Sequence, residues 1–135
     1  MIVLDTNVLV SGLLTPRGSP AHVLRLVFSG HVLVAHDHRI IAEYRGVLFR
    51  GRLGFDRGVV EEVLEVIERQ GFATVALPLR QVLPDPGDAI FLEVARSARA
   101  DSIVTGNKRH FPASIAGPLG IRILSPSEFL RDIAE

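Results

Sequence analysis

The sequence predicts an α/β protein in which a parallel β-sheet is covered by helices on both faces. Short runs rich in Val, Ile and Leu alternate with segments of helical periodicity along the chain. No linker, internal repeat or low-complexity tract interrupts this alternation. Apolar strands that alternate with helices are typical of parallel sheets buried on both sides. The length of 135 residues, with 47% hydrophobic residues, suits one domain, which we expect to span residues 1–135.

Five apolar runs have the length and composition of buried strands. They cover residues 2–5, 31–35, 72–77, 102–105 and 121–124. We therefore expect a central sheet of about five strands, joined by right-handed crossovers. The carboxyl ends of parallel strands meet at one edge of a sheet, and this edge is where a functional site is expected.

Capping residues and helix breakers define the helices that alternate with these strands. The predicted helices run from Ser19 to Gly30, from Asp37 or His38 to about Arg50, from Asp56 to Gly71, from Pro86 to about Ala98, and onward from Ser125. The third of these is amphipathic, with one apolar face formed by Val59, Val60, Val63, Leu64 and Ile67. The last begins with a capping-box pattern, in which Ser125 is followed three residues later by Glu128.

The composition narrows the possible classes of function. Basic and acidic residues balance at 15 each, so the chain as a whole lacks the basic footprint of many nucleic-acid-binding proteins. The absence of cysteine excludes disulfides, thiolate metal sites and a cysteine nucleophile, and it fits a cytoplasmic protein. No apolar run reaches 18 residues, so we expect no transmembrane helix, and the early Asp5 is unlike a signal peptide.

Four polar residues lie at or after the ends of predicted strands. Asp5 ends the first strand, Glu43 lies in the helix after the second, Asp88 begins the helix after the third, and Asn107 follows the fourth. Carboxylates that share a pocket repel one another unless a cation is present. Oxygen ligands without His or Cys suit Mg²⁺ or Mn²⁺, and such an ion favours phosphodiester hydrolysis.

Each of these residues also has a purely structural interpretation. Asp5 could end a strand as a turn residue, and Glu43 could be a solvated helix residue beside the apolar stripe. Asp88 could serve in the cap of its helix together with Asp85, although we favour Asp88 as the ligand and Asp85 as the cap. Asn107 could be the N-cap of a short turn.

Four segments carry a resemblance to a known family. They are Asp5-Thr6-Asn7, Glu43-Tyr44-Arg45, the run from Asp85 to Leu92, and the run from Ile103 to Lys108. In this order and spacing they resemble the PIN domain over nearly the full length, and more narrowly the VapC-type toxins. The resemblance implies a three-layer α/β/α sandwich and Mg²⁺- or Mn²⁺-dependent endonucleolytic cleavage of RNA.

The resemblance also assigns roles to individual residues. It implies that Asp5, Glu43 and Asp88 are the metal ligands, and that Thr6, Asn7 and Thr105 support them. Asn107 stands where many members have a fourth Asp. Its amide oxygen could orient a water but brings no charge, so binding of a second metal ion becomes doubtful. The resemblance further implies an RNA substrate, a homodimer, and a cognate antitoxin whose tail blocks the active site.

Other interpretations remain open at this point. The neutral Asn107 would also suit a catalytically weak PIN-like domain that only binds RNA or protein. Asp5-Thr6-Asn7 loosely resembles a phospho-aspartate loop, but Asn7 stands where that class needs a second Asp. The His36-Asp37-His38 run suggests zinc, yet no third nitrogen or sulfur ligand is predicted nearby. Four arginines could line an RNA path or simply be solvated: Arg45, Arg50, Arg52 and Arg57.

Overall fold

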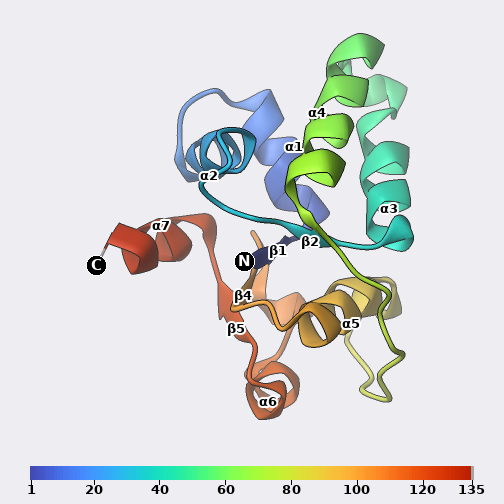
Figure 1. The fold of residues 1–135 in the computed structure, drawn as a ribbon, viewed down its shortest axis with the longest axis vertical. Helices are drawn as coiled ribbons and strands as arrows, with labels where there is room; N and C mark the ends of the chain where they lie inside the picture. Colours follow the sequence, from blue (N-terminus) through green and yellow to red (C-terminus); the bar gives the residue numbers. More distant parts are fainter. Residues whose placement is uncertain (135) are drawn as a thin grey trace.

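The computed structural model describes residues 1–134, which form parallel strands between two groups of helices (Figure 1). The strands are β1 (Ile2–Leu4), β2 (Ala35–His36), β3 (Phe72–Ala73), β4 (Ser102–Val104) and β5 (Arg122–Leu124). All strand pairs are parallel. In Figure 1, α1–α4 lie on one side of the strands and α5 and α6 on the other. The predicted α/β/α class is therefore confirmed.

The prediction of one sheet of about five strands was wrong in its connectivity. The sheet containing β1 has three strands, in the order β1-β4-β5, while β2 and β3 form a separate pair. A single bridge between Ile2 and Val34 links the two. The N–H groups of His31 and Val32 donate to the Leu26 carbonyl at the end of the preceding helix, so this segment cannot extend the ladder beside β1.

The third strand is also shorter than predicted. Thr74 N still donates to the carbonyl of His36 in β2 at 2.9 Å, but farther along the chain two backbone N–H groups are bound by side chains of α5. Leu77 N donates to Ser97 Oγ at 3.0 Å, and Leu79 N donates to Glu93 Oε2 at 3.0 Å. The segment is thus held against a helix, which ends the β2–β3 pairing after two residues.

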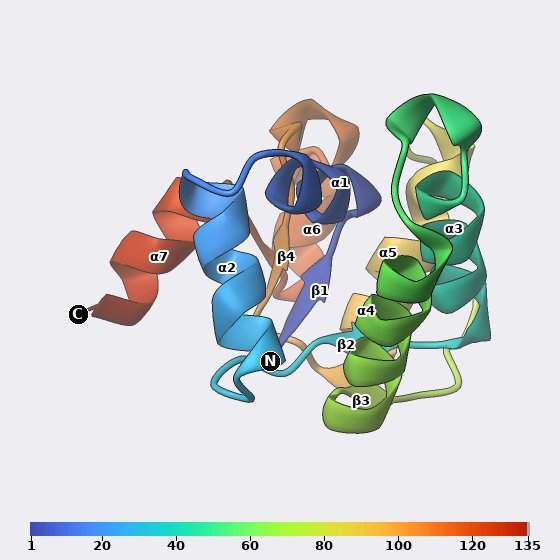
Figure 2. The same cartoon turned by 90° about the horizontal axis from the view of Figure 1, so that it is seen from above.

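The described residues contain seven α-helices and four 3₁₀ turns. The α-helices are α1 (Thr6–Leu14), α2 (Ser19–Phe28), α3 (His38–Leu48), α4 (Arg57–Gln70), α5 (Ala89–Ala98), α6 (Ala113–Ala116) and α7 (Pro126–Ala134). The 3₁₀ turns are η1 (Gly51–Leu53), η2 (Pro86–Asp88), η3 (Lys108–His110) and η4 (Gly117–Leu119). Figure 2 shows α7 beside α2 at one end of the molecule and α3 beside α4 at the other, and both pairs are in contact. None of the described helices is long and apolar enough to cross a membrane.

Predicted capping residues explain where α3, α4 and α7 begin, whereas α2 begins after Gly18 without a side-chain cap. Asp37 accepts hydrogen bonds from the N–H groups of Arg39 and Ile40, and Asp56 accepts one from Val59. The capping box is confirmed, because Ser125 N donates to Glu128 Oε1 at 2.8 Å while Glu128 N donates to Ser125 Oγ at 3.1 Å.

The end of α4 lies in close backbone contact with the chain before β2. The predicted apolar face is buried except for Val59, which is 48% exposed because it lies one position outside the stripe. The helix ends at Gly71, where a Cβ atom would lie 2.4 Å from the Val34 carbonyl oxygen and 2.5 Å from that of Ile67. Only glycine lets the end of α4 approach the chain before β2 this closely.

Candidate active site

A cleft of about 470 Å³ lies at the carboxyl edge of the three-stranded sheet. Five of the predicted site residues line it: Asp5, Thr6, Asn7, Glu43 and Asp88. They come from the end of β1, from α1, from α3 and from η2, which are far apart along the chain. The strand-end rule therefore predicted correctly where polar side chains gather.

Asp5 is held in place by the neighbouring strand β4. Its N–H donates to the Val104 carbonyl at 3.0 Å, and the Thr105 hydroxyl donates to Asp5 Oδ2 at 2.7 Å. Burial raises the pKa of the Asp5 carboxyl, and the hydrogen bond from Thr105 offsets only part of this effect. Asp5 thus has a fixed orientation and an electrostatic environment that disfavours its charged form.

Thr105 and Asn107 are not among the residues that line the cleft. Asn107 N donates to Thr105 Oγ1 at 3.0 Å, so its backbone orients the hydroxyl that binds Asp5. Asn107 is the residue before η3, and its side chain makes no capping hydrogen bond there. Its predicted catalytic role stays a prediction. The amide of Asn7 ties the same loop to α1, because its Oδ1 accepts from Gly106 N at 3.1 Å.

Asp85 and Asp88, either of which could cap the same helix according to the sequence, have different roles in the structure. Asp85 caps η2, since its Oδ1 accepts from Gly87 N at 2.9 Å. Asp88 makes no capping hydrogen bond and is buried in the cleft. Burial and the negative charge of Asp5 raise the pKa of Asp88 to about 6, while His110 acts in the opposite direction. Asp88 Oδ2 lies 3.0 Å from Nδ1 of His110.

Glu43 reaches the cleft because its neighbour anchors α3 to the sheet. Tyr44 is fully buried, and its hydroxyl donates to the carbonyl of Leu4, directly before Asp5. The adjacent Glu43 lies on the flank of the buried stripe, as the helical pattern predicted. Its Oε2 atom is buried and has no hydrogen-bond partner among the described residues.

These residues fit a divalent cation in donor type and burial. Among the described residues, buried oxygens of Glu43 and Thr6 have no hydrogen-bond partner, and the buried Oδ2 of Asp88 has only its contact with His110. Unpaired buried carboxylates are costly, and a hard cation with oxygen ligands removes that cost. Within residues 1–134, however, no three acidic or imidazole side chains are arranged to hold one ion as they stand. Coordination by all three carboxylates therefore requires them to move closer together.

Sequence reasoning missed three residues of the cleft or left their roles undecided. His110, in the loop after β4, lines the cleft and faces Asp88. Arg50 and Arg52 line the cleft, whereas Arg45 pairs with Glu61 and Arg57 lies 4.8 Å from the centre of the Phe49 ring. The available signal was the group of arginines in and after the helix that carries Glu43. Helical periodicity alone could not tell which of these arginines face the cleft.

The suggested zinc site at His36-Asp37-His38 finds no support in the geometry. Asp37 is used as the cap of α3, His36 is buried and His38 is exposed. No metal-binding group of three appears there in the described part of the chain.

Comparison with known proteins identifies the class to which this fold and site belong. Residues 1–109 match the PIN domain, so the chain belongs to the PIN domain family. This is a nuclease-type fold; proteins with it are commonly nucleases, and such nucleases usually use divalent metal ions. The chain is also 28% identical, over 112 residues, to an uncharacterized protein of Methanocaldococcus jannaschii, covering 79% of this chain and 70% of that protein. No solved structure matches the chain.

Proposed function

We propose that this protein is a Mg²⁺- or Mn²⁺-dependent endoribonuclease that acts as the toxin of a toxin–antitoxin system. The observation that carries the proposal is the gathering of Asp5, Glu43 and Asp88 in one cleft at the carboxyl edge of the sheet. The pKa of Asp5 and the pKa of Asp88 are both raised by burial, as expected for acids that await a cation. The match to a family of nucleases supports the reaction class.

The carboxylates of Asp5, Glu43 and Asp88 would hold the ion, and a neighbouring side chain positions or contacts each of them. A bound divalent ion supplies a site for phosphate oxygens and lowers the pKa of a water molecule. Thr105 holds Asp5 in one orientation, and Tyr44 anchors the middle of α3, where Glu43 lies, to the carbonyl of Leu4. His110 lies against Asp88 and can donate a proton to an oxygen that leaves the phosphate.

The toxin role rests on the ordered resemblance to VapC-type proteins and on the chemistry of the cleft. An arginine from an antitoxin tail would pair with the buried carboxylates in place of the cation. We also propose a homodimer. Co-expression with a short neighbouring reading frame, followed by co-purification, tests the antitoxin. Recovery of the nuclease alone, with full activity, would contradict this role.

The experiment that tests the nuclease proposal compares the wild type with Asp5→Asn on single-stranded RNA in Mn²⁺. We expect the variant to lose activity by about 100-fold or more, because it removes a charged metal ligand without changing the shape of the side chain. Asp101→Asn is the matched control, since Asp101 is exposed and pairs with the N-terminal ammonium at the opposite edge of the sheet. Equal cleavage by wild type and Asp5→Asn would reject the proposal.

Binding of the divalent ion should weaken as the pH falls below about 6. The pKa of Asp88 is raised to about 6, so a proton competes with the ion for this carboxyl below that pH. Titration calorimetry with Mn²⁺ should give an affinity at pH 5 about tenfold lower than at pH 7, since one proton is displaced. An affinity that does not change between pH 7 and pH 5 would show that Asp88 does not bind the ion.

A second candidate function is a PIN-like domain that binds RNA without cleaving it. The neutral Asn107 and the separation of the three carboxylates favour this alternative. The same RNA assay distinguishes the two, because such a domain would bind RNA equally well with and without Mn²⁺ and leave it intact.

A further inference from the structure

We propose that Arg50 and Arg52, together with Val47 and Leu53, form a subsite that binds one unpaired nucleotide of RNA beside the acidic side chains. This inference rests on the proposed function and names a contact surface for its substrate. All four residues line the same cleft as Asp5, Glu43 and Asp88. Phosphate binding on the arginines would hold the strand next to carboxylates that by themselves repel it.

The contacts of the four clustered arginines single out this pair. Arg45 is engaged by Glu61, and Arg57 lies over the ring of Phe49. Arg50 and Arg52 are exposed, and within residues 1–134 neither side chain has a hydrogen bond or an ion pair. Two free guanidinium groups at the mouth of an acidic cleft are available for phosphate oxygens, to which Arg binds in bidentate geometry.

A short, well-defined turn carries both arginines. Leu53 N donates to the Arg50 carbonyl at 3.0 Å, and Gly54 N donates to the Gly51 carbonyl at 3.2 Å. Gly54 closes the turn with a φ of 70°, a conformation that favours glycine. The backbone of η1 is thus fixed, and both arginine side chains line the cleft.

The apolar residues beside the arginines suit a base. Val47 on α3 and Leu53 on η1 are half-buried, and Val10 on α1 completes this wall of the cleft. An unstacked base can pack on such a surface and on a guanidinium plane, whereas the bases of a duplex are stacked inside the helix. The cleft can therefore accept a single-stranded nucleotide, with its phosphate on Arg50 or Arg52 and its base on Val47 and Leu53.

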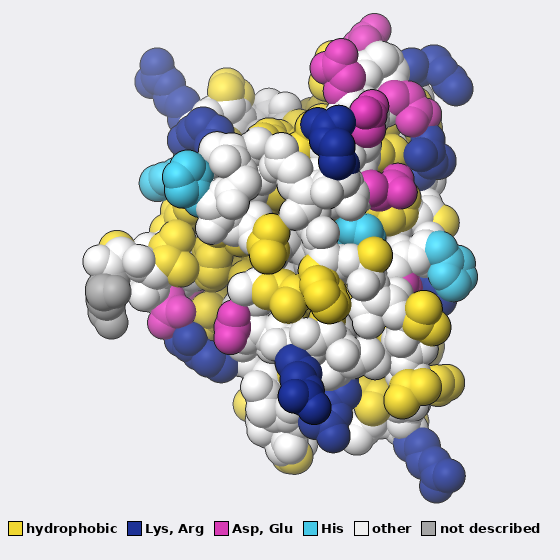
Figure 3. Space-filling model, in the orientation of Figure 1, with side chains coloured by type: hydrophobic (Ala, Val, Ile, Leu, Met, Phe, Trp, Pro, Cys, Tyr) yellow, Lys and Arg dark blue, Asp and Glu magenta, His cyan; other side chains and the backbone are white. Residues whose placement is uncertain are grey.

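The charges elsewhere direct RNA to this side of α3. On the face seen in Figure 3, acidic side chains gather over α4. The exposed glutamates of that helix are Glu61, Glu62, Glu65 and Glu68. Glu61 and Glu65 are paired with Arg45 and Arg69, but Glu62 and Glu68 have no ion pair among the described residues. Their charges disfavour a path along α4 for a strand that leaves the cleft, so η1 is the favourable exit.

The test measures RNA affinity in the Asp5→Asn background, which should prevent cleavage during the measurement. A fluorescent single-stranded RNA of about 12 nucleotides is titrated at several salt concentrations. We expect Arg50→Ala/Arg52→Ala to weaken binding about tenfold or more at low salt. The slope of log K against log salt should become shallower by about 0.7, the value for one lost phosphate contact to a single strand. Leu53→Ala should weaken binding without changing this slope.

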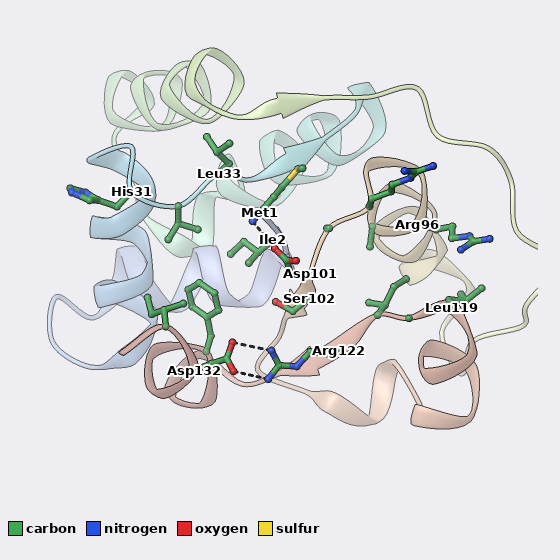
Figure 4. Close-up of a pocket in the computed structure, with 18 residues that line it drawn as sticks. Met1, Ile2, His31, Leu33, Arg96, Asp101, Ser102, Leu119, Arg122 and Asp132 are labelled. Carbon is green, nitrogen blue, oxygen red and sulfur yellow. Dashed lines mark hydrogen bonds and ion pairs between the residues drawn. The ribbon is translucent and has the colours of Figure 1, made fainter. Parts of the chain in front are cut away.

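A matched control is available at the opposite edge of the sheet. Arg96 and Arg99 line a cavity there, beside the Met1–Asp101 and Arg122–Asp132 ion pairs (Figure 4). Arg96→Ala/Arg99→Ala removes the same two charges far from the acidic cleft, and we expect its RNA affinity to match the parent's. An equal loss in both double variants would mean that only overall charge matters and would overturn the proposal.

Two further outcomes separate this inference from the function on which it rests. If Arg50→Ala/Arg52→Ala binds with unchanged affinity and salt slope while the protein with Asp5 intact still cleaves RNA, the subsite is wrong and the nuclease stands. If double-stranded RNA loses affinity to the same extent as single-stranded RNA, the arginines do not select an unpaired nucleotide. The nuclease function and the subsite are both supported if Asp5→Asn abolishes cleavage and Arg50→Ala/Arg52→Ala weakens RNA binding as expected.

Discussion

Asp88→Asn is expected to stabilise the protein in EDTA while it reduces RNA cleavage by about 100-fold or more. The pKa of Asp88 is raised to about 6 by burial and by Asp5, so at pH 7.5 the folded metal-free protein holds a charge that burial disfavours. Asparagine has the same shape without the charge. We expect a gain of about 1–2 kcal/mol in the free energy of unfolding, measured by urea denaturation in EDTA.

The pH dependence of this gain has a defined sign. Because the folded pKa lies above the unfolded value of 3.8, wild-type stability falls as the pH rises from about 4 to about 6. The advantage of Asp88→Asn should therefore be full at pH 7.5 and almost absent near pH 4. Asp85→Asn, which keeps an oxygen for the cap of η2, is the control and should show no such gain. A destabilised Asp88→Asn protein in EDTA would contradict the environment described for this carboxyl.

Gly71→Ala is expected to be the most damaging single-methyl substitution, at about 3 kcal/mol or more of lost stability. The added Cβ would lie 2.4 Å and 2.5 Å from two backbone carbonyl oxygens, those of Val34 and Ile67. Backbone atoms in the sheet and in α4 cannot move aside as a flexible side chain would. The backbone angles at Gly71 are ones that alanine readily adopts, so the loss measures close packing and not conformational strain.

Gly46→Ala provides the contrast for this measurement. Gly46 lies within α3, and no atom is within 4 Å of the place where its Cβ would be. Alanine there should stabilise the protein by about 0.5–1 kcal/mol through its higher helix propensity. If thermal melts show Gly71→Ala within 1 kcal/mol of the wild type, α4 does not approach β2 as closely as described.

Local sequence signals predicted the helices well because their caps act over a few residues. Asp37, Asp56 and the Ser125–Glu128 box begin helices where their side chains bind free N–H groups. Helix α1 had no such signal. It is rich in Val and Leu and contains Gly12, whose Cβ position lies 2.5 Å from Leu24 Cδ1, so packing against α2 determines this helix. The same holds for β2 and β3, which competing hydrogen bonds shorten.

For the candidate site too, some features could be predicted from the sequence and others depend on contacts between distant parts of the chain. Asp5, Glu43 and Asp88 could be predicted because parallel strand ends converge and because the ordered motifs resemble a family. The separate roles of Asp85 and Asp88 required coordinates, since both lie at the start of one helix. The contact of His110 with Asp88 joins two 3₁₀ turns, η3 and η2, that follow different strands. No pattern in the sequence connects these turns.

The hydrogen bond between Thr105 and Asp5 spans 100 positions, which has a consequence for synthesis. While the chain emerges from the ribosome, the first half carries Asp5 and Glu43 but neither Asp88 nor the strand β4 that pairs with β1. The nascent protein therefore cannot assemble the acidic cleft until β4 and Thr105 have left the exit tunnel. If the proposed function is correct, prematurely terminated products that lack β4 should not cleave RNA.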